Sequence, residues 1–149
     1  MPGPSELKAH LGYWLRFVSN HVSHAFARRV EARGVTVAEW VVLRELFENA
    51  MPPSLMAGKL GMTRGAITKL ADRLIAKGLV VRTARDDDRR YQSLAITDAG
   101  RALVPDLAGL ADANDAHFFG HLSGTDRAEL LRLLTGLVRH HDLKTIPTE

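Results

Sequence analysis

A short helix with capped ends, in the middle of the chain, constrains the fold more than any other feature. Thr63 is a good N-cap residue and Gly78 supplies a left-handed stop, so the sequence predicts a helix between them. One side of this helix is apolar at helical spacing, with Ile67, Leu70, Leu74 and Ile75. The other side carries small, hydrogen-bonding and charged residues, namely Arg64, Gly65, Thr68, Lys69 and Asp72. The apolar side must pack on a core, which leaves the other side free to meet a partner.

A basic hairpin is predicted directly after this helix. Residues 79–82 and 93–96 have the composition of two short strands, and the stretch between them is charged and turn-forming. A helix with donor-bearing side chains, followed by a hairpin with arginines at its tip, suits duplex DNA as a partner.

Two helices are predicted at the N-terminal end. The first is long and amphipathic, runs from a cap at Ser5 to about residue 32, and ends at Gly34. The second begins at Thr36, with Glu39 at the reciprocal position of a capping box.

A third, short helix is predicted to begin at Pro52–Pro53, because proline suits only the first turn, and to close at Gly61. Together with the helix that Thr63 opens, it forms a helix-turn-helix unit. In such a unit the second helix enters the major groove of DNA.

Two further helices are predicted after the hairpin. Thr97 caps the first, which runs to about His121, and Pro105 inside it is expected to kink it. Residues 123–126 cap the last helix, whose apolar face is unusually broad and consists of Leu130, Leu131, Leu133, Leu134, Leu137 and Val138. One small lobe cannot cover such a face, so the first and the last two helices predict an intertwined dimer interface.

The bulk properties agree with one small DNA-binding protein. The 149 residues, 46% of them hydrophobic, suffice for one core. The formal charge is +3 and the pI about 9.6, with Lys and Arg concentrated in residues 59–90. Cysteine is absent, which fits the cytoplasm. No apolar run approaches the roughly 20 residues of a membrane span, and the N-terminus lacks a signal pattern, so we expect a soluble protein without a leader.

Three stretches of the sequence resemble the MarR family of bacterial regulators. They are Leu60–Arg82 (LGMTRGAITKLADRLIAKGLVVR), Asp88–Arg90 (DRR) and Leu94–Gly100 (LAITDAG). The order of six helices, with a wing between the fourth and the fifth, is similar too, and the similarity covers about residues 5–142. The resemblance implies a fold that is mainly α with a small β-wing, a winged helix-turn-helix built of six helices and a two-stranded hairpin.

The resemblance and the helix pattern together predict how the chain is divided. Residues 5–35 and 98–142 form the helical dimerisation region, and residues 36–97 form the winged helix-turn-helix lobe that binds DNA. Residues 143–149 are expected to be a flexible tail.

The side chains of the helix that starts after Thr63 are chemically suited to the major groove. Arg64 can donate two hydrogen bonds to guanine, and Thr68 can bond a base or touch a thymine methyl group. Gly65 and Ala66 permit close approach. Thr63 itself and Lys69 are expected to contact phosphates.

At the wing, the resemblance implies an Asp-x-Arg unit in which the carboxylate orients an arginine that enters the minor groove. By position, Asp88 is the orienting residue and Arg90 the inserted one. Arg85, Arg89 and Arg82 are then candidates for phosphate contacts, although Arg82 can instead pair within the lobe.

The resemblance also implies a small aromatic or anionic effector, bound where the dimer helices meet the DNA-binding lobe. The candidates to line this pocket are Trp14, Phe17, His21, Trp40 and Arg44, with Arg44 or His21 pairing an anionic group. Aromatic residues at helical spacing are equally expected in a core, so core packing stays open as the alternative.

Metal binding is the main competing interpretation. His117 and His121 lie four residues apart on one predicted helix, and His21 and His24 lie three apart on another. A complete site would need a further ligand, for instance Glu39 or Asp115. The pairs alone assign no metal residue and no cofactor.

No catalytic motif is present, since the chain has no Gly-x-Ser-x-Gly elbow, no phosphate-binding glycine loop and no cysteine. The sequence therefore predicts a homodimeric, ligand-responsive repressor of transcription that binds a pseudo-palindromic site on double-stranded DNA. A zinc-responsive regulator of the same fold and a non-specific DNA-packaging protein are the alternatives.

Overall fold

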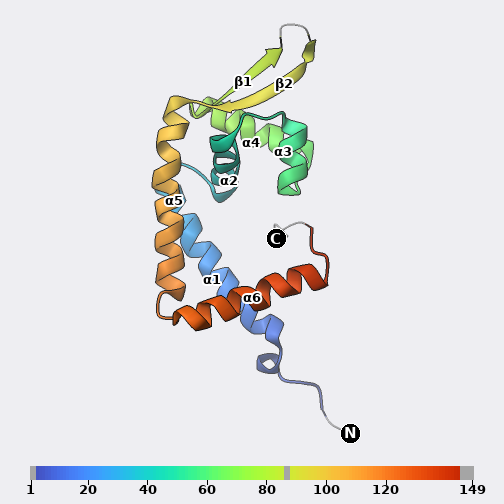
Figure 1. Cartoon of the computed structure of the whole chain (residues 1–149), viewed down its shortest axis with the longest axis vertical. Coiled ribbons are helices and arrows are strands. Elements are labelled where there is room, and N and C mark those ends of the chain that lie inside the picture. The colour runs from blue at the N-terminus through green and yellow to red at the C-terminus, as the bar shows by residue number, and fades with distance from the viewer. Residues whose placement is uncertain (1–2, 86–87, 145–149) are drawn as a thin grey trace.

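The computed structural model describes residues 3–85 and 88–144, without the side chains of residues 85 and 88–91. The molecule has two parts (Figure 1): a lobe that carries the two-stranded wing, and a base of long helices in which α1 packs on α5 and α6 turns across the end of α5. The lobe consists of α2 (Val37–Glu48), α3 (Pro53–Leu60), α4 (Arg64–Ala76), β1 (Val80–Arg85) and β2 (Asp88–Ile96). The base consists of one 3₁₀ turn (Leu7–Ala9), α1 (Leu11–Glu31), α5 (Asp98–Phe119) and α6 (Gly124–His140).

The predicted fold class, six helices with a small antiparallel wing, is confirmed. The intertwined dimer and the division into a dimerisation region and a DNA-binding lobe stay predictions. Most of the predicted tail, residues 145–149, lies outside the described residues. In the described part of the chain, no helix is both long and apolar enough to cross a membrane.

The predicted helix boundaries in the lobe are confirmed, because they depend on local hydrogen bonds. The Thr36 hydroxyl accepts a hydrogen bond from the Glu39 amide (3.1 Å), and the Glu39 carboxylate accepts one from the Thr36 amide (2.9 Å), which is a complete capping box. The Thr63 hydroxyl caps α4 by accepting from the Ala66 amide at 3.1 Å. Gly78 has a φ of 75°, the left-handed conformation that ends this helix.

Two details differ from the sequence-based expectation, and a third, the kink at Pro105, stays a prediction. Ser5 does not cap the first helix: His10 is extended, so a 3₁₀ turn precedes α1, which begins at Leu11. The strands are longer than predicted, because backbone pairing continues from the base of the wing into the charged stretch as far as Arg85 opposite Asp88. Helix α5 runs through Pro105 without interruption. Pro105 is exposed, so the carbonyl that it leaves without a helical donor can bond water.

The lobe has its own hydrophobic core, whereas the base does not. The largest fully buried apolar side chains come mainly from the lobe and from the part of α5 that packs on it: Leu43, Leu46, Met56, Ile67, Leu74, Leu94 and Leu107. Helix α1 buries only Val30, and α6 buries no residue at all. The apolar stripe of α4 is confirmed as core-facing, which leaves its other side exposed.

Two joints hold the wing in place on the lobe. Met51, in the loop before α3, exchanges two backbone hydrogen bonds with Leu94 of β2, at 3.1 and 2.8 Å. At the other joint, the Thr97 hydroxyl donates to the Gly78 carbonyl at 2.8 Å and accepts from the Gly100 amide at 3.1 Å. Thr97, which directly follows the wing, thus bonds the chain to the end of α4 and also caps α5.

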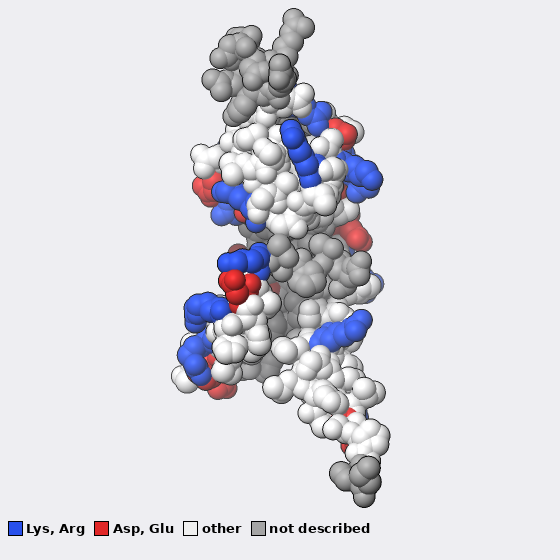
Figure 2. Space-filling model, turned by 90° about the vertical axis from the view of Figure 1, so that its right-hand side faces the viewer, with Lys and Arg blue, Asp and Glu red and all other residues white. Residues whose placement is uncertain are grey.

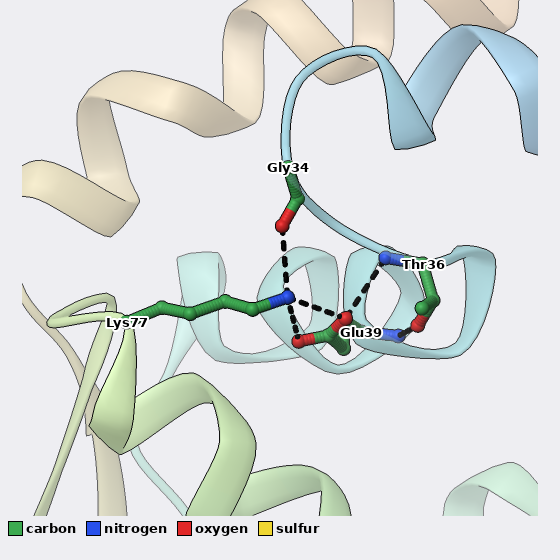
Figure 3. A network of polar contacts seen from close by, with 4 residues as sticks. All are labelled: Gly34, Thr36, Glu39 and Lys77. Carbon is green, nitrogen blue, oxygen red and sulfur yellow. Dashed lines mark hydrogen bonds and ion pairs between the residues drawn. The ribbon is translucent and has the colours of Figure 1, made fainter.

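An ion pair between a buried carboxylate and a partly exposed amine links the end of α4 to the start of α2 (Figure 3). The Glu39 side chain is 1% exposed, and the Lys77 amine donates to its Oε1 at 2.9 Å and lies 2.8 Å from its Oε2. The same amine donates to the Gly34 carbonyl, just after α1, at 2.8 Å. A carboxylate buried this deeply requires such partners, because an isolated charge away from water is very unfavourable.

We expect Gly100→Ala to destabilise the protein by about 2–3 kcal/mol, because the added methyl group would overlap the Leu79 carbonyl oxygen and the Ile96 side chain. Gly109→Ala in the same helix is the matched control, since nothing lies within 4 Å of its added Cβ. That control should stabilise the protein by roughly 0.5–1 kcal/mol. Urea unfolding followed by circular dichroism measures both changes, and equal effects would contradict the close approach at Gly100.

We expect Glu39→Gln to weaken the acid dependence of stability. Burial alone would raise the pKa of the Glu39 carboxyl, but the hydrogen bonds from Lys77 and Thr36 outweigh it and leave the pKa below the usual value. The pair therefore stabilises the protein at neutral pH, and this contribution is lost as pH falls from about 4.3, the usual glutamate pKa, through the lower pKa of the folded state.

The amide keeps the shape but cannot ionise, so Glu39→Gln should cost about 1–3 kcal/mol near neutral pH and little in acid. Unfolding free energies measured between about pH 7 and about pH 3 test this. Glu48→Gln, at an exposed carboxylate paired with Arg44, is the control and should follow the wild type. A Glu39→Gln profile parallel to the wild type would contradict the ion pair.

Candidate nucleic-acid interface

The outer face of α4 is exposed along its first two turns. Thr63, Arg64, Gly65, Thr68 and Lys69 are all exposed, and Ala66 is half-buried. The helix stands at the surface of the lobe because its opposite stripe packs on the core. The residues predicted to meet DNA therefore lie together on one side of one helix.

Two local interactions shape what this face can offer. The Thr68 hydroxyl donates to the Arg64 carbonyl at 3.0 Å, so Thr68 retains an acceptor and a methyl group for a base. At Gly65, nothing lies within 4 Å of the position that a Cβ would occupy. Gly65 thus leaves open space at the surface, where a nucleic-acid backbone or base could approach closely.

An ion pair joins α4 to the wing. Arg82 of β1 donates to Asp72 of α4 at 3.0 Å. Arg82 therefore pairs within the lobe, as the sequence left open, and the pair orients the wing relative to α4. Asp72 is also the only acidic residue among the described side chains of α4.

The wing itself is placed by its backbone. Strands β1 and β2 are antiparallel, with Val80 opposite Ile96, and their register shifts between Ala84 and Arg85. The side chains predicted to contact DNA here, those of Arg85, Asp88, Arg89 and Arg90, lie outside the described residues.

The lobe presents a basic surface beside α4. Figure 2 views the molecule from the α3 side: Lys and Arg side chains project from the lobe, with fewer Asp and Glu among them, around a largely uncharged surface. The exposed basic residues of α3, α4 and β1 are Lys59, Arg64, Lys69, Arg73 and Arg82. Such a distribution attracts phosphates while it leaves small and neutral side chains against base edges.

The residues predicted to bind an effector lie in different surroundings. Trp14 and Phe17 are about half exposed on α1, and the His21 ring stacks on Phe17 with centroids 5.1 Å apart. Trp40 packs against the lobe core, which agrees with the alternative interpretation for that residue. Arg44 pairs with Glu48 at 3.0 Å. No described cavity is lined by these residues, so their role in binding an effector stays a prediction.

Another cavity, which the sequence did not single out, lies at the junction of α5 and α6. Its volume is about 130 Å³, and an ion pair between Asp115 and Arg127 (2.8 Å) borders it. The apolar residues that line it are Phe119, Leu122, Leu130, Leu131 and Leu134. The sequence showed Leu130, Leu131 and Leu134 only as part of a broad apolar face, because a pocket between two helices depends on their crossing.

The structure assembles no metal site from the predicted histidine pairs. Among the residues with described side chains, no three His, Asp or Glu lie close enough to hold a metal ion. Of the two suggested additional ligands, Glu39 is engaged by Lys77 and Asp115 by Arg127.

Comparison with known proteins identifies the family. The model of the MarR family matches residues 35–91, which include the helix-turn-helix and most of the wing. The putative transcriptional regulatory protein for the hcr operon of Thauera aromatica is 29% identical over 135 residues, 89% of this chain and 81% of that protein. The HTH-type transcriptional repressor MdtR of Bacillus subtilis is 30% identical over 101 residues, 67% of this chain and 65% of its own length.

A solved structure agrees with these relatives. CouR from Rhodococcus jostii RHA1, bound to p-coumaroyl-CoA, superposes with a TM-score of 0.75 at 28% identity, and the match covers 90% of this chain and 95% of that one. The capped recognition helix, the wing and the long helices of the base are therefore features of one established architecture, and the chain belongs to the MarR family of transcriptional regulators.

Proposed function

We propose that this regulator is a ligand-responsive repressor that binds a pseudo-palindromic operator as a homodimer. It acts on DNA in the cytoplasm and is not an enzyme. The observation that carries the proposal is the exposed outer face of α4, which sets Arg64, Gly65 and Thr68 beside a wing fixed to the same helix. In a helix-turn-helix protein such a face reads base edges, while surrounding basic side chains bind phosphates.

The role of each DNA-contacting residue follows from its chemistry. Arg64 is proposed to read guanine, and Thr68 to accept from a base or to touch a thymine methyl group. Thr63 and Lys69 bind phosphates, while Gly65 and Ala66 admit the backbone. At the wing, Arg90, oriented by Asp88, enters the minor groove, and Arg85 with Arg89 binds the flanking phosphates.

The exposed apolar faces of the base support dimerisation. In α6, Leu131 is 61% exposed and Leu133 50%, and in α1 Leu11 is 82% exposed and Leu15 47%. A lone chain would leave this apolar surface in water, whereas a second copy would bury it. Residues 5–35 and 98–142 would then form the shared base, with two lobes holding half-sites about one helical turn apart.

A small aromatic or anionic effector is proposed where the base meets the lobe. CouR was solved with p-coumaroyl-CoA, an aromatic acyl thioester, and this chain carries the stacked Phe17 and His21 rings with Trp14 on the same helix. The proposed set is Trp14, Phe17, His21, Trp40 and Arg44. An effector would relieve repression by binding better to a dimer whose recognition helices do not match the operator spacing.

Selection from a random duplex library tests the proposed function. At about 150 mM salt, the protein should enrich an inverted repeat that it binds at least ~1,000-fold more tightly than scrambled competitor. Tight binding without enrichment of any sequence would instead indicate a non-specific DNA-packaging protein.

We expect Arg64→Ala to weaken binding to the selected site by about 1–3 kcal/mol per half-site and to relax the preference at one base pair. Lys69→Ala is the contrasting variant, because losing a phosphate contact should weaken all sequences alike and lower the salt dependence by about one charge. Fluorescence anisotropy titrations at several salt concentrations measure both. If Arg64→Ala kept the base preference of the wild type, Arg64 would not be a base-contacting residue.

We expect Leu134→Asp to convert the dimer into monomers, because it places a charge on the apolar face of α6. Operator affinity should fall by at least about tenfold as the second half-site is lost. Arg139→Glu, on the opposite side of α6, is the control for a charge change and should leave the dimer intact. Light scattering coupled to gel filtration measures the mass. A Leu134→Asp protein that stays dimeric would move the interface away from α6.

A further inference from the structure

The two ends of α4 are held in different ways. At its N-terminal end, the Thr63 cap is a bond within the helix, and the neighbouring side chains face solvent. At its C-terminal end, Lys77 reaches out of the helix to Gly34 and Glu39 (Figure 3). Gly34 lies just beyond α1, and Glu39 lies in the first turn of α2. One amino group therefore connects the ends of three helices.

This connection is directional and consists of two hydrogen bonds and one further ion-pair contact. The Lys77 amine has three protons and three oxygen neighbours, the Gly34 carbonyl at 2.8 Å and the two Glu39 carboxylate oxygens at 2.9 and 2.8 Å. Glu39 is held in turn by the Thr36 amide at 2.9 Å. Within the part of the chain whose side chains are described, no other side-chain hydrogen bond joins α4 or its cap residues to the segment from α1 to α2.

Without this connection, α4 would be held on the lobe core mainly by its buried apolar side chains, including Ile67, Leu70 and Leu74. Such contacts favour burial but discriminate weakly among small rotations, because the hydrophobic effect is non-directional. The hydrogen bonds of Lys77 specify an angle as well as a distance.

We propose that Lys77 and Glu39 are positioning residues that fix the angle of α4 relative to α1 and so set the separation of the two recognition helices in the dimer. This inference rests on the proposed function. In the dimer, the partner places α1, the Gly34 carbonyl moves with the end of α1, and Lys77 carries that displacement to the end of α4.

The geometry makes small rotations significant. Helix α4 has 13 residues and is therefore about 20 Å long. A rotation of about 10° around its anchored end would move its first turn by roughly 3–4 Å, close to the ~3.4 Å rise of one base pair. If the angle of α4 were no longer fixed, the dimer would therefore also bind operators whose half-site spacing differs by one base pair.

The first test measures the separation without DNA. Because the chain has no cysteine, Lys69→Cys introduces a single exposed spin-label site on α4 of each protomer. In this background, pulsed electron paramagnetic resonance on the full-length dimer should give a narrow distance distribution. Lys77→Met, which keeps the aliphatic stem but removes the amine, should shift or broaden it by about 3 Å or more. Lys77→Arg, which retains a cation with several donors, should restore much of the narrow distribution.

The second test uses operators whose half-site spacing is changed by one base pair in either direction. The wild type should lose at least about tenfold in affinity, and Lys77→Met should bind the original site more weakly and lose much less on respacing. Glu39→Gln should change the profile in the same direction. Leu46→Ala, which removes a fully buried side chain elsewhere in the lobe, controls for lost stability. Arg127→Met controls for breaking an ion pair of the same 2.8 Å length far from α4.

The possible outcomes are distinct. A distance distribution that Lys77→Met leaves unchanged overturns the positioning role even if the protein binds a specific operator. Equal broadening in Leu46→Ala also overturns it, because lost stability would then be the cause. If no spin-label distance between protomers is detected, both the dimer and this inference are overturned. A dimer whose distances respond to Lys77→Met upholds the inference even where no operator is found.

Discussion

The burial of one carboxylate organises the joint on which the rest of the lobe depends. Glu39 is both the reciprocal partner in the cap of α2 and the acceptor for Lys77 at the end of α4. A buried carboxylate without partners is very unfavourable, so the burial of Glu39 requires the start of α2 and the end of α4 to form next to each other. An apolar residue at this position could fill the same space, but it would leave the Thr36 amide without its partner and α4 without a directional contact. The ion pair therefore combines a contribution to stability at neutral pH with directional contacts between α2 and α4.

The lobe buries its own hydrophobic core, whereas the base leaves apolar faces exposed. The lobe encloses a core, and its wing is bonded to the loop before α3 and to the end of α4. The base exposes whole apolar faces on α1 and α6, and Asn114, between α1 and α5, is buried with its Oδ1 unbonded in the described structure. Apolar surface on this scale is normal only where something covers it. The elements proposed to read DNA therefore form within one chain, whereas in the proposed dimer their mutual spacing would be set by the association of two chains.

Sequence reasoning succeeded where the determining interactions are local. The caps at Thr36 and Thr63 and the stop at Gly78 each involve groups a few residues apart, so residue type and spacing were enough. The bond from Lys77 to Gly34 joins residues 43 positions apart, and no spacing pattern encodes it. The length of the wing strands was underestimated because backbone pairing, once started by a good register, continues through residues with low strand propensity.

For the candidate site the same distinction holds. The outer face of α4 was predictable because a helix places its residues at known angles, so a buried stripe determines the exposed one. The effector residues were grouped by chemical type, and type does not determine which residues share a cavity. Trp40 lies against the lobe core, while Trp14 is half exposed on α1, so the two tryptophans have different surroundings.

Gly65 shows how the requirements of folding and recognition differ within one helix. In the first turns of α4 a glycine is less favourable than alanine by roughly 0.5–1 kcal/mol, and nothing in the chain occupies the space that a methyl group would take. At Gly100 the opposite holds, because the Leu79 carbonyl occupies that space and the fold itself requires glycine. The fold does not require a glycine between Arg64 and Thr68, and at this exposed position it leaves room for the close approach of DNA that we propose.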